Sequence, residues 1–156
     1  MTMDFDLPES AQVVRDGVAA IAARYDAAYW GRCEEEQRFP QEVWDELADG
    51  GWLGLNVPEE YGGGGQGLLE LTVANEALTA SGGVAGTFLY ITTPGFGATT
   101  IARHGTAEQK EQILPGIAAG RQQFCLALTE PDAGTNTIEI TTQARRDGDD
   151  FLVRGQ

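Results

Sequence analysis

Apolar residues recur at helical spacing along most of the chain, in stretches separated by glycine or proline. Over residues 10–29 they fall at steps of three and four with charged residues between them, which is typical of a helix that buries one face. A second apolar stripe follows Pro40, the expected first helical residue, and Gly50-Gly51 stops it. A third helix is predicted over residues 68–80, and Ser81-Gly82-Gly83 closes it.

Two further helices are predicted before the pattern changes. The stretch 84–103 has a helical pattern with a break expected at Pro94-Gly95. Thr106 and Gln109 form a Thr-x-x-Gln capping box, which opens a short helix expected to end before Pro115.

The pattern becomes β-like at Gln122. Alternation over residues 124–128 predicts a short buried strand, and a loop rich in turn residues follows over 131–136. Two β-rich runs on either side of Asp147-Gly148 predict a hairpin. Two or three short strands leave their edges exposed and bury little surface. We therefore expect the sheet to continue beyond Gln156 or to be completed by another subunit.

The predicted fold class is therefore mainly α, with a helical N-terminal domain over residues 1–121. Residues 122–156 are expected to form the beginning of a β-domain that is incomplete in this chain. The N-terminus has no basic region followed by an apolar stretch, so no signal peptide is expected and a cytoplasmic location is the default. Proline and glycines interrupt the weakly polar stretch 84–101, which excludes it as a membrane span.

Charge and cysteine content narrow the classes of partner and cofactor. Lys and Arg number 10 against 24 Asp and Glu, which gives a net charge of −14 and argues against binding to nucleic acid or anionic membranes. Cys33 and Cys125 do not form a Cys-x-x-Cys motif or a Cys/His cluster, so no metal site is predicted and both are expected to be buried thiols.

Two segments invite a phosphate-binding interpretation. The glycines at 62–65 lack the P-loop ending and the dinucleotide spacing, so a flexible turn is the better interpretation. Residues 126–137 are more promising, because a strand would end at Thr129 and the N–H groups around Gly134 could form a nest for a pyrophosphate. An ordinary turn at the end of a strand fits the same spacing, and the residues alone leave both interpretations open.

Three motifs resemble the acyl-CoA dehydrogenase family. LALTEPDAGTNT at 126–137 is similar to the family signature, which is an aliphatic residue, Thr or Ser, Glu-Pro, two residues and Gly-Ser-Asp. FPQEVWDELADGGWLGLNVPEEYGGGGQG at 39–67 resembles the family's early helices and Pro-Glu-x-Tyr-Gly-Gly loop, and HGTAEQKEQILPGIAAG at 104–120 resembles the stretch that leads into the signature. Together the motifs span residues 39–137 in the family's order.

The resemblance implies a flavoprotein with FAD as cofactor. Family proteins have a helical N-terminal domain, a middle β-domain and a C-terminal helical domain, and they usually assemble as homotetramers. Carried over residue by residue, the resemblance implies that Leu126, Leu128 and Thr129 contact the flavin ring. It also implies that Gly134 and Thr135 contact the FAD pyrophosphate or the bound acyl-CoA, which makes Thr135 a candidate substrate-binding residue as well.

This chain departs from the family signature at two positions and lacks the catalytic base. Thr135 replaces the usual Ser and keeps its hydroxyl, whereas Asn136 replaces the usual Asp and removes a charge. The family's base, a glutamate, is expected downstream of Gln156, so no catalytic residue is assigned and this chain alone is expected to be inactive. Glu130 belongs to the turn motif and is not expected to be that base.

The implied activity is α,β-dehydrogenation of an acyl thioester to a 2,3-enoyl thioester. Its implied partners are acyl-CoA or an acyl-carrier-protein thioester and an electron-transfer flavoprotein. A related flavin oxidase or monooxygenase of the same fold is an alternative, because fold likeness does not separate these reactions. A non-catalytic helical subunit or interaction module is the alternative from another class.

Overall fold

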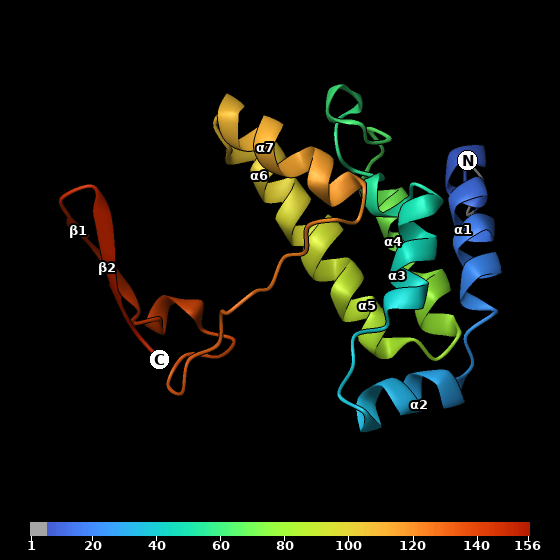
Figure 1. Cartoon of the computed structure of the whole chain (residues 1–156), viewed down its shortest axis with the longest axis horizontal. Helices are drawn as coiled ribbons and strands as arrows, with labels where there is room; N and C mark the ends of the chain where they lie inside the picture. The colour runs from blue at the N-terminus through green and yellow to red at the C-terminus, as the bar shows by residue number, and fades with distance from the viewer. Residues whose placement is uncertain (1–5) are drawn as a thin grey trace, which may run out of the picture. The chain divides into compact units, whose positions relative to one another are not determined.

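The computed structural model describes residues 6–156, which form two compact units (Figure 1). The first unit ends at Cys125 and is helical, and the second runs from Leu126 to Gln156 and holds a two-stranded antiparallel sheet. The mainly α fold class predicted from the sequence is confirmed. The helices of the first unit are α1 (Glu9–Ala22), α2 (Ala27–Glu35), α3 (Gln41–Asp49), α4 (Leu68–Ala80), α5 (Val84–Tyr90), the π-helical η3 (Ile91–Ala98), α6 (Thr99–His104) and α7 (Ala107–Ala118), with 3-10 turns η1 (Trp52–Gly54) and η2 (Glu59–Tyr61).

The single helix predicted over residues 10–29 is wrong, because the chain breaks after Ala22. Apolar spacing continues across the break, but the Asp26 carboxylate accepts a hydrogen bond from the backbone N–H of Tyr29 at 2.9 Å. An aspartate in this position caps a new helix and competes with continuation of the old one. Residues 27–29, predicted as the end of the first helix, therefore begin α2, which places Trp30 and Cys33 in the core.

The main core of the first unit lies between α1, α3 and α4, which run side by side in Figure 1. Its fully buried side chains include Val18 of α1, Leu53 of η1 and Leu78 of α4. Trp44 of α3 is also buried, and its indole N–H donates to the carbonyl of Gly120 at 2.8 Å. This bond ties the segment after α7 to the main core.

Two prolines lie inside helices, where the sequence predicted helix ends. At Pro94 the break expected from the sequence is wrong, because η3 continues α5 into α6 in the wider π-helical form with the proline inside it. The carbonyl of Pro94 accepts a hydrogen bond from the Asn56 side-chain N–H at 2.7 Å, outside the helix's own ladder. The predicted end of α7 before Pro115 is also wrong, since the helix runs on to Ala118 and buries Leu114 and Ile117 in a second core cluster.

The second unit contains the 3-10 turn η4 (Thr137–Glu139) and the strands β1 (Gln143–Asp147) and β2 (Asp150–Arg154). The strands pair antiparallel with Arg145 opposite Leu152, and Gly148 in the turn has a φ of 67°. The predicted hairpin at Asp147-Gly148 is confirmed, but the first β-rich run, expected over residues 138–144, becomes a strand only from Gln143. Both strands are exposed along their whole length, as expected for a sheet with too few strands to bury a face.

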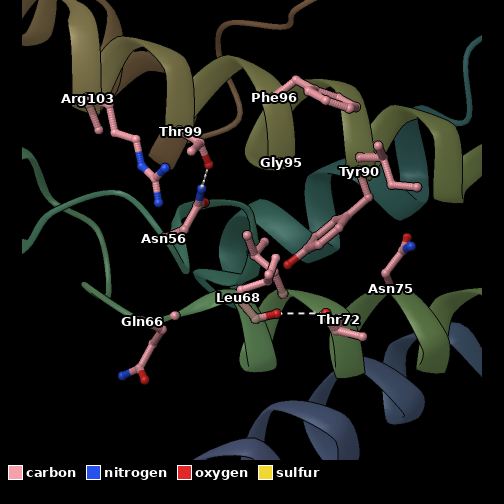
Figure 2. A pocket seen from close by; sticks show the side chains of 14 residues that line it. Asn56, Gln66, Leu68, Thr72, Asn75, Tyr90, Gly95, Phe96, Thr99 and Arg103 are labelled. Carbon is pink, nitrogen blue, oxygen red and sulfur yellow. Dashed lines mark hydrogen bonds between the residues drawn. The ribbon is translucent and has the colours of Figure 1, made fainter.

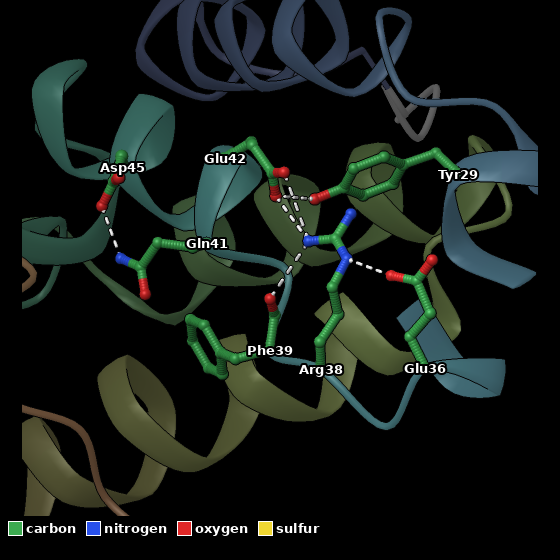
Figure 3. A network of polar contacts seen from close by, with 7 residues as sticks. All are labelled: Tyr29, Glu36, Arg38, Phe39, Gln41, Glu42 and Asp45. Carbon is green, nitrogen blue, oxygen red and sulfur yellow. Dashed lines mark hydrogen bonds and ion pairs between the residues drawn. The ribbon is translucent and has the colours of Figure 1, made fainter. Parts of the chain in front are cut away.

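A polar network joins α2 to the start of α3 (Figure 3). The Arg38 guanidinium donates to the Glu42 carboxylate at 2.9 Å and to Glu36 at 3.1 Å. The Tyr29 hydroxyl donates to Glu42 at 2.7 Å. The bonds from Tyr29 and Arg38 lower the pKa of Glu42 to about 2, and burial together with Glu42 raises the pKa of Tyr29.

We expect this network to make stability depend on pH below neutrality. The lowered pKa of Glu42 adds stability that is present above its unfolded pKa and is lost as pH falls from about 4.5 toward about 2. Thermal midpoints measured across this window should fall less steeply for Glu42→Gln than for the unsubstituted chain. Glu34→Gln, which removes an exposed carboxylate of α2 that has no ion pair among the described residues, is the matched control. Parallel curves for all three proteins would contradict the assignment.

Candidate cofactor-binding segment and interhelical cavity

The five residues predicted to contact the cofactor all lie in the segment 126–136 of the second unit. The strand predicted over residues 124–128 is wrong, because that stretch is extended but unpaired. A strand requires a neighbour, and none of the other described residues offers its backbone to residues 125–129. Leu126 and Leu128 are each about half exposed, at 53% and 49%, so their side chains and the backbone between them are open to a ligand.

A tight turn follows this extended stretch. The backbones of Glu130 and Ala133 exchange hydrogen bonds of 3.0 and 3.2 Å, and Ala133 is buried. The Glu130 carboxylate accepts bonds of 2.8 Å from the N–H of Thr142 and from the N–H and hydroxyl of Thr141. These bonds lower the pKa of Glu130 to about 2. Its carboxylate is thus committed to holding the turn against residues 141–142, in keeping with a turn role and not with that of a proton acceptor.

The backbone after the turn offers hydrogen-bond donors. Within the described chain the N–H groups of Gly134, Thr135 and Asn136 have no intramolecular acceptor, and the Thr135 side chain is exposed. Apart from the two neighbours of Gly134 in the chain, no described residue has an atom within 4 Å of a Cβ placed there. The Asn136 side-chain N–H donates to the Glu139 carboxylate at 3.3 Å. Three unpaired amides beside an open glycine are the donor set that suits a pyrophosphate, so these residues fit the phosphate part of FAD.

The glycine-rich loop at 62–65 has no such donors. Its amides and that of Gln66 donate to backbone carbonyls of the preceding residues, for example Gly64 to Gly54 at 2.9 Å and Gln66 to Leu55 at 2.7 Å. A Cβ on Gly63 would lie 2.1 Å from the Val57 carbonyl oxygen. The glycines therefore allow close packing of backbone on backbone, and the interpretation as a turn fits better than a phosphate loop.

A cavity of about 600 Å³ lies in the first unit between α4 and the continuous helix α5–η3–α6 (Figure 2). Its walls are mainly apolar, with Leu68 and Leu71 on one side and Phe96 on the other. Asn56 and Asn75 also line it, and the side-chain oxygen of each is buried without a hydrogen-bond partner among residues 6–156. None of the five predicted residues lines this cavity. Sequence reasoning missed it because segments far apart in the chain form its two walls.

The structure also tests the predictions made for the two cysteines. Cys33 is buried as predicted, but Cys125 is exposed, since it lies where the chain leaves the helical unit. Across residues 6–156 there is no cluster of three or more histidine, cysteine or acidic side chains able to hold a metal ion. In that same range no helix is both long and apolar enough to cross a membrane.

Comparison with known proteins places this chain in a family. Residues 8–121 match the family model of the acyl-CoA dehydrogenase N-terminal domain. Acyl-CoA dehydrogenase FadE12 of Mycobacterium tuberculosis is 43% identical over 148 residues, which are 95% of this chain and 38% of that protein. The short-chain-specific acyl-CoA dehydrogenase of Clostridium acetobutylicum is 33% identical over 153 residues, 98% of this chain and 40% of that protein.

Similarity to solved structures agrees with the sequence matches. The acyl-CoA dehydrogenase of Geobacillus kaustophilus superposes with a TM-score of 0.81 at 28% identity, over 98% of this chain and 40% of that one. The chain belongs to the acyl-CoA dehydrogenase family, as its motifs predicted. It spans about 40% of the length of the curated relatives that it matches.

Proposed function

We propose that this chain is the N-terminal part of an FAD-dependent acyl-CoA dehydrogenase that converts an acyl thioester into a 2,3-enoyl thioester. The observation that carries the proposal is the set of unpaired backbone amides at 134–136 within the family signature. Membership in a family of acyl-CoA dehydrogenases supports the reaction class.

The roles of the individual residues follow from their positions along the segment. Leu126, Leu128 and Thr129 would hold the flavin ring, through exposed side chains and backbone groups that have no partner within the described chain. The amides of Gly134 and Thr135 would donate to the pyrophosphate, and the exposed Thr135 hydroxyl would donate to phosphate or to the bound acyl-CoA. When bound, FAD supplies the hydride acceptor for the oxidation.

The proposal extends to organisation and partners. Residues 1–121 would be the helical N-terminal domain and 122–156 the beginning of the middle β-domain. We propose a homotetramer that takes acyl-CoA, or an acyl chain on a carrier protein, and passes electrons to an electron-transfer flavoprotein. Glu130 would not be the carboxylate base, because its carboxylate is committed to its turn.

The direct test uses the natural gene product purified from its host. With FAD and an acyl-CoA in the absence of oxygen, it should form the enoyl thioester, detected by mass spectrometry, and reduce an electron-transfer flavoprotein. Hydrogen peroxide formed in air with acyl-CoA would instead indicate an oxidase. A protein that neither retains flavin nor alters any acyl thioester would overturn the proposal in favour of a non-catalytic helical subunit.

Gly134 gives a specific prediction for cofactor affinity. We expect Gly134→Asp to weaken FAD binding at least tenfold (roughly 1.4 kcal/mol), because a carboxylate beside the pyrophosphate repels it and the site has few compensating charges. The fold should be unchanged, since nothing lies within 4 Å of the added Cβ. Gly134→Ala is the matched control and should retain most of the affinity. Equal FAD affinity for the Asp and Ala variants, measured by flavin fluorescence, would argue against this position as the phosphate site.

A further inference from the structure

The chain leaves the first unit through a short, well-held stretch that ends at Phe124. The amides of Arg121 and Gln122 donate to the carbonyl of Gly116 in α7 at 2.8 and 3.1 Å. The Phe124 ring packs against the second core cluster, beside Gly97. Beyond Phe124, residues 125–129 have no backbone partner among the described residues. Phe124 is thus the final fixed point before the segment to which we assign flavin contacts.

The Thr93 hydroxyl contacts both the backbone N–H and the backbone carbonyl of Phe124. The N–H of Phe124 donates to the Thr93 hydroxyl oxygen at 2.9 Å, and the hydroxyl faces the Phe124 carbonyl at 3.5 Å. Thr93 is 1% exposed, so water does not compete for these groups. We call this pair of contacts the Thr93 clamp.

The π-helical η3 contains both Thr93, which makes the Thr93 clamp, and Gly97, which leaves space for the Phe124 ring. Thr93 lies in η3 directly before Pro94, and its hydroxyl bonds to another segment. The neighbouring Thr92 hydroxyl bonds back to carbonyls of its own helix, at Phe88 and Leu89. Gly97 provides the space for the phenyl ring, because a Cβ there would lie 2.5 Å from Cγ of Phe124.

We propose that Thr93, with Gly97, is a positioning residue for the flavin-binding segment, acting through Phe124. This inference rests on the proposed function. An extended stretch that begins at a fixed residue has fewer conformations than one that begins at a free residue. The clamp therefore lowers the ordering cost when residues 126–129 close on FAD, which is preorganisation and not direct contact.

The test compares Thr93→Val with Thr92→Val and Thr93→Ser in the natural gene product that carries these 156 residues, using amide exchange by mass spectrometry and FAD titration. Valine keeps the shape of threonine but not its hydroxyl, and serine restores the hydroxyl. We expect Thr93→Val to speed exchange of the Phe124 amide about tenfold and to weaken FAD binding by about the same factor, the size of one lost hydrogen bond. Thr92→Val and Thr93→Ser should leave both values near those of the unsubstituted chain.

The possible outcomes separate the clamp from the proposed function. Unchanged exchange at Phe124 in Thr93→Val would overturn the clamp itself. Faster exchange with unchanged FAD affinity would overturn the positioning role while leaving the proposed function intact. An unsubstituted chain that shows no response to FAD would refute the proposed cofactor site, and the positioning role would fall with it. Slow exchange at Leu78, inside α4, in every variant verifies that the core has remained folded.

Discussion

Replacing Gly63 by alanine is expected to destabilise the helical unit by about 3 kcal/mol, the upper range for overpacking a close contact. The new Cβ would lie 2.1 Å from the Val57 carbonyl oxygen and 2.6 Å from that of Gly54. Both are backbone atoms, so relief requires the loop to move away from residues 54–57. That movement would break the bonds from Gly64 to Gly54 and from Gly65 to Val57, each 2.9 Å long.

Gly31→Ala is the matched control for Gly63→Ala. Gly31 lies inside α2, and a Cβ placed there meets no atom within 4 Å. Alanine favours the helix over glycine by about 1 kcal/mol, so this variant should be as stable as the unsubstituted chain or more so. Urea denaturation measures the free energy of unfolding of both variants. A Gly63→Ala protein within 1 kcal/mol (about the size of a typical single substitution) of the unsubstituted chain would contradict the packing role of this loop.

Replacing Trp44 by alanine is expected to cost about 4 kcal/mol, near the middle of the range for buried aromatic residues. Trp44 is 3% exposed, and its ring meets that of Phe39 edge-on at 5.6 Å between centroids. The substitution empties this volume and also leaves the Gly120 carbonyl without the indole donor. Because Gly120 lies in the exit from α7, the loss should affect the start of the segment leading to Phe124.

A second substitution at Trp44 separates packing from hydrogen bonding. Trp44→Phe keeps most of the aromatic volume and removes the N–H donor, so it should cost about 1–2 kcal/mol, at most half the effect of alanine. Phe88→Ala removes an aromatic ring that is 66% exposed and should change the free energy of unfolding little. Equal losses for Trp44→Phe and Trp44→Ala would show that the hydrogen bond dominates and that the packing argument is wrong.

Local signals predicted most helices of this chain from the sequence. The bounds of α4, Leu68–Ala80, agree with the prediction because glycines flank both ends, and the capping box at Thr106 begins α7 as expected. The wrong helix boundaries lie where a capping residue or a proline competed with the apolar pattern of a continuous helix. The Asp26 cap divided a continuous apolar pattern, and Pro94 was accommodated by a π-helical turn that no residue spacing encodes.

The sequence predicted which residues form the candidate site, but not the structure of their backbone. The signature at 126–137 could be located from its residues, but the state of its backbone could not, because strand pairing depends on neighbours elsewhere in the fold. The Glu130 bonds to residues 141–142 likewise join positions that no local pattern relates. The cavity and the contact of Thr93 with Phe124 needed the three-dimensional arrangement for the same reason.

The most direct test of the account is an NMR titration of the isotope-labelled 156-residue chain with FAD, using adenosine alone as a control without phosphate. NMR detects weak binding and reports each amide separately. The account predicts that FAD shifts the amide signals of Leu126, Leu128, Thr129, Gly134 and Thr135, and that adenosine leaves those of Gly134 and Thr135 in place. Shifts confined to the glycine loop at 62–65, with the signals of Gly134 and Thr135 unchanged, would contradict the assignment of this segment as the cofactor site.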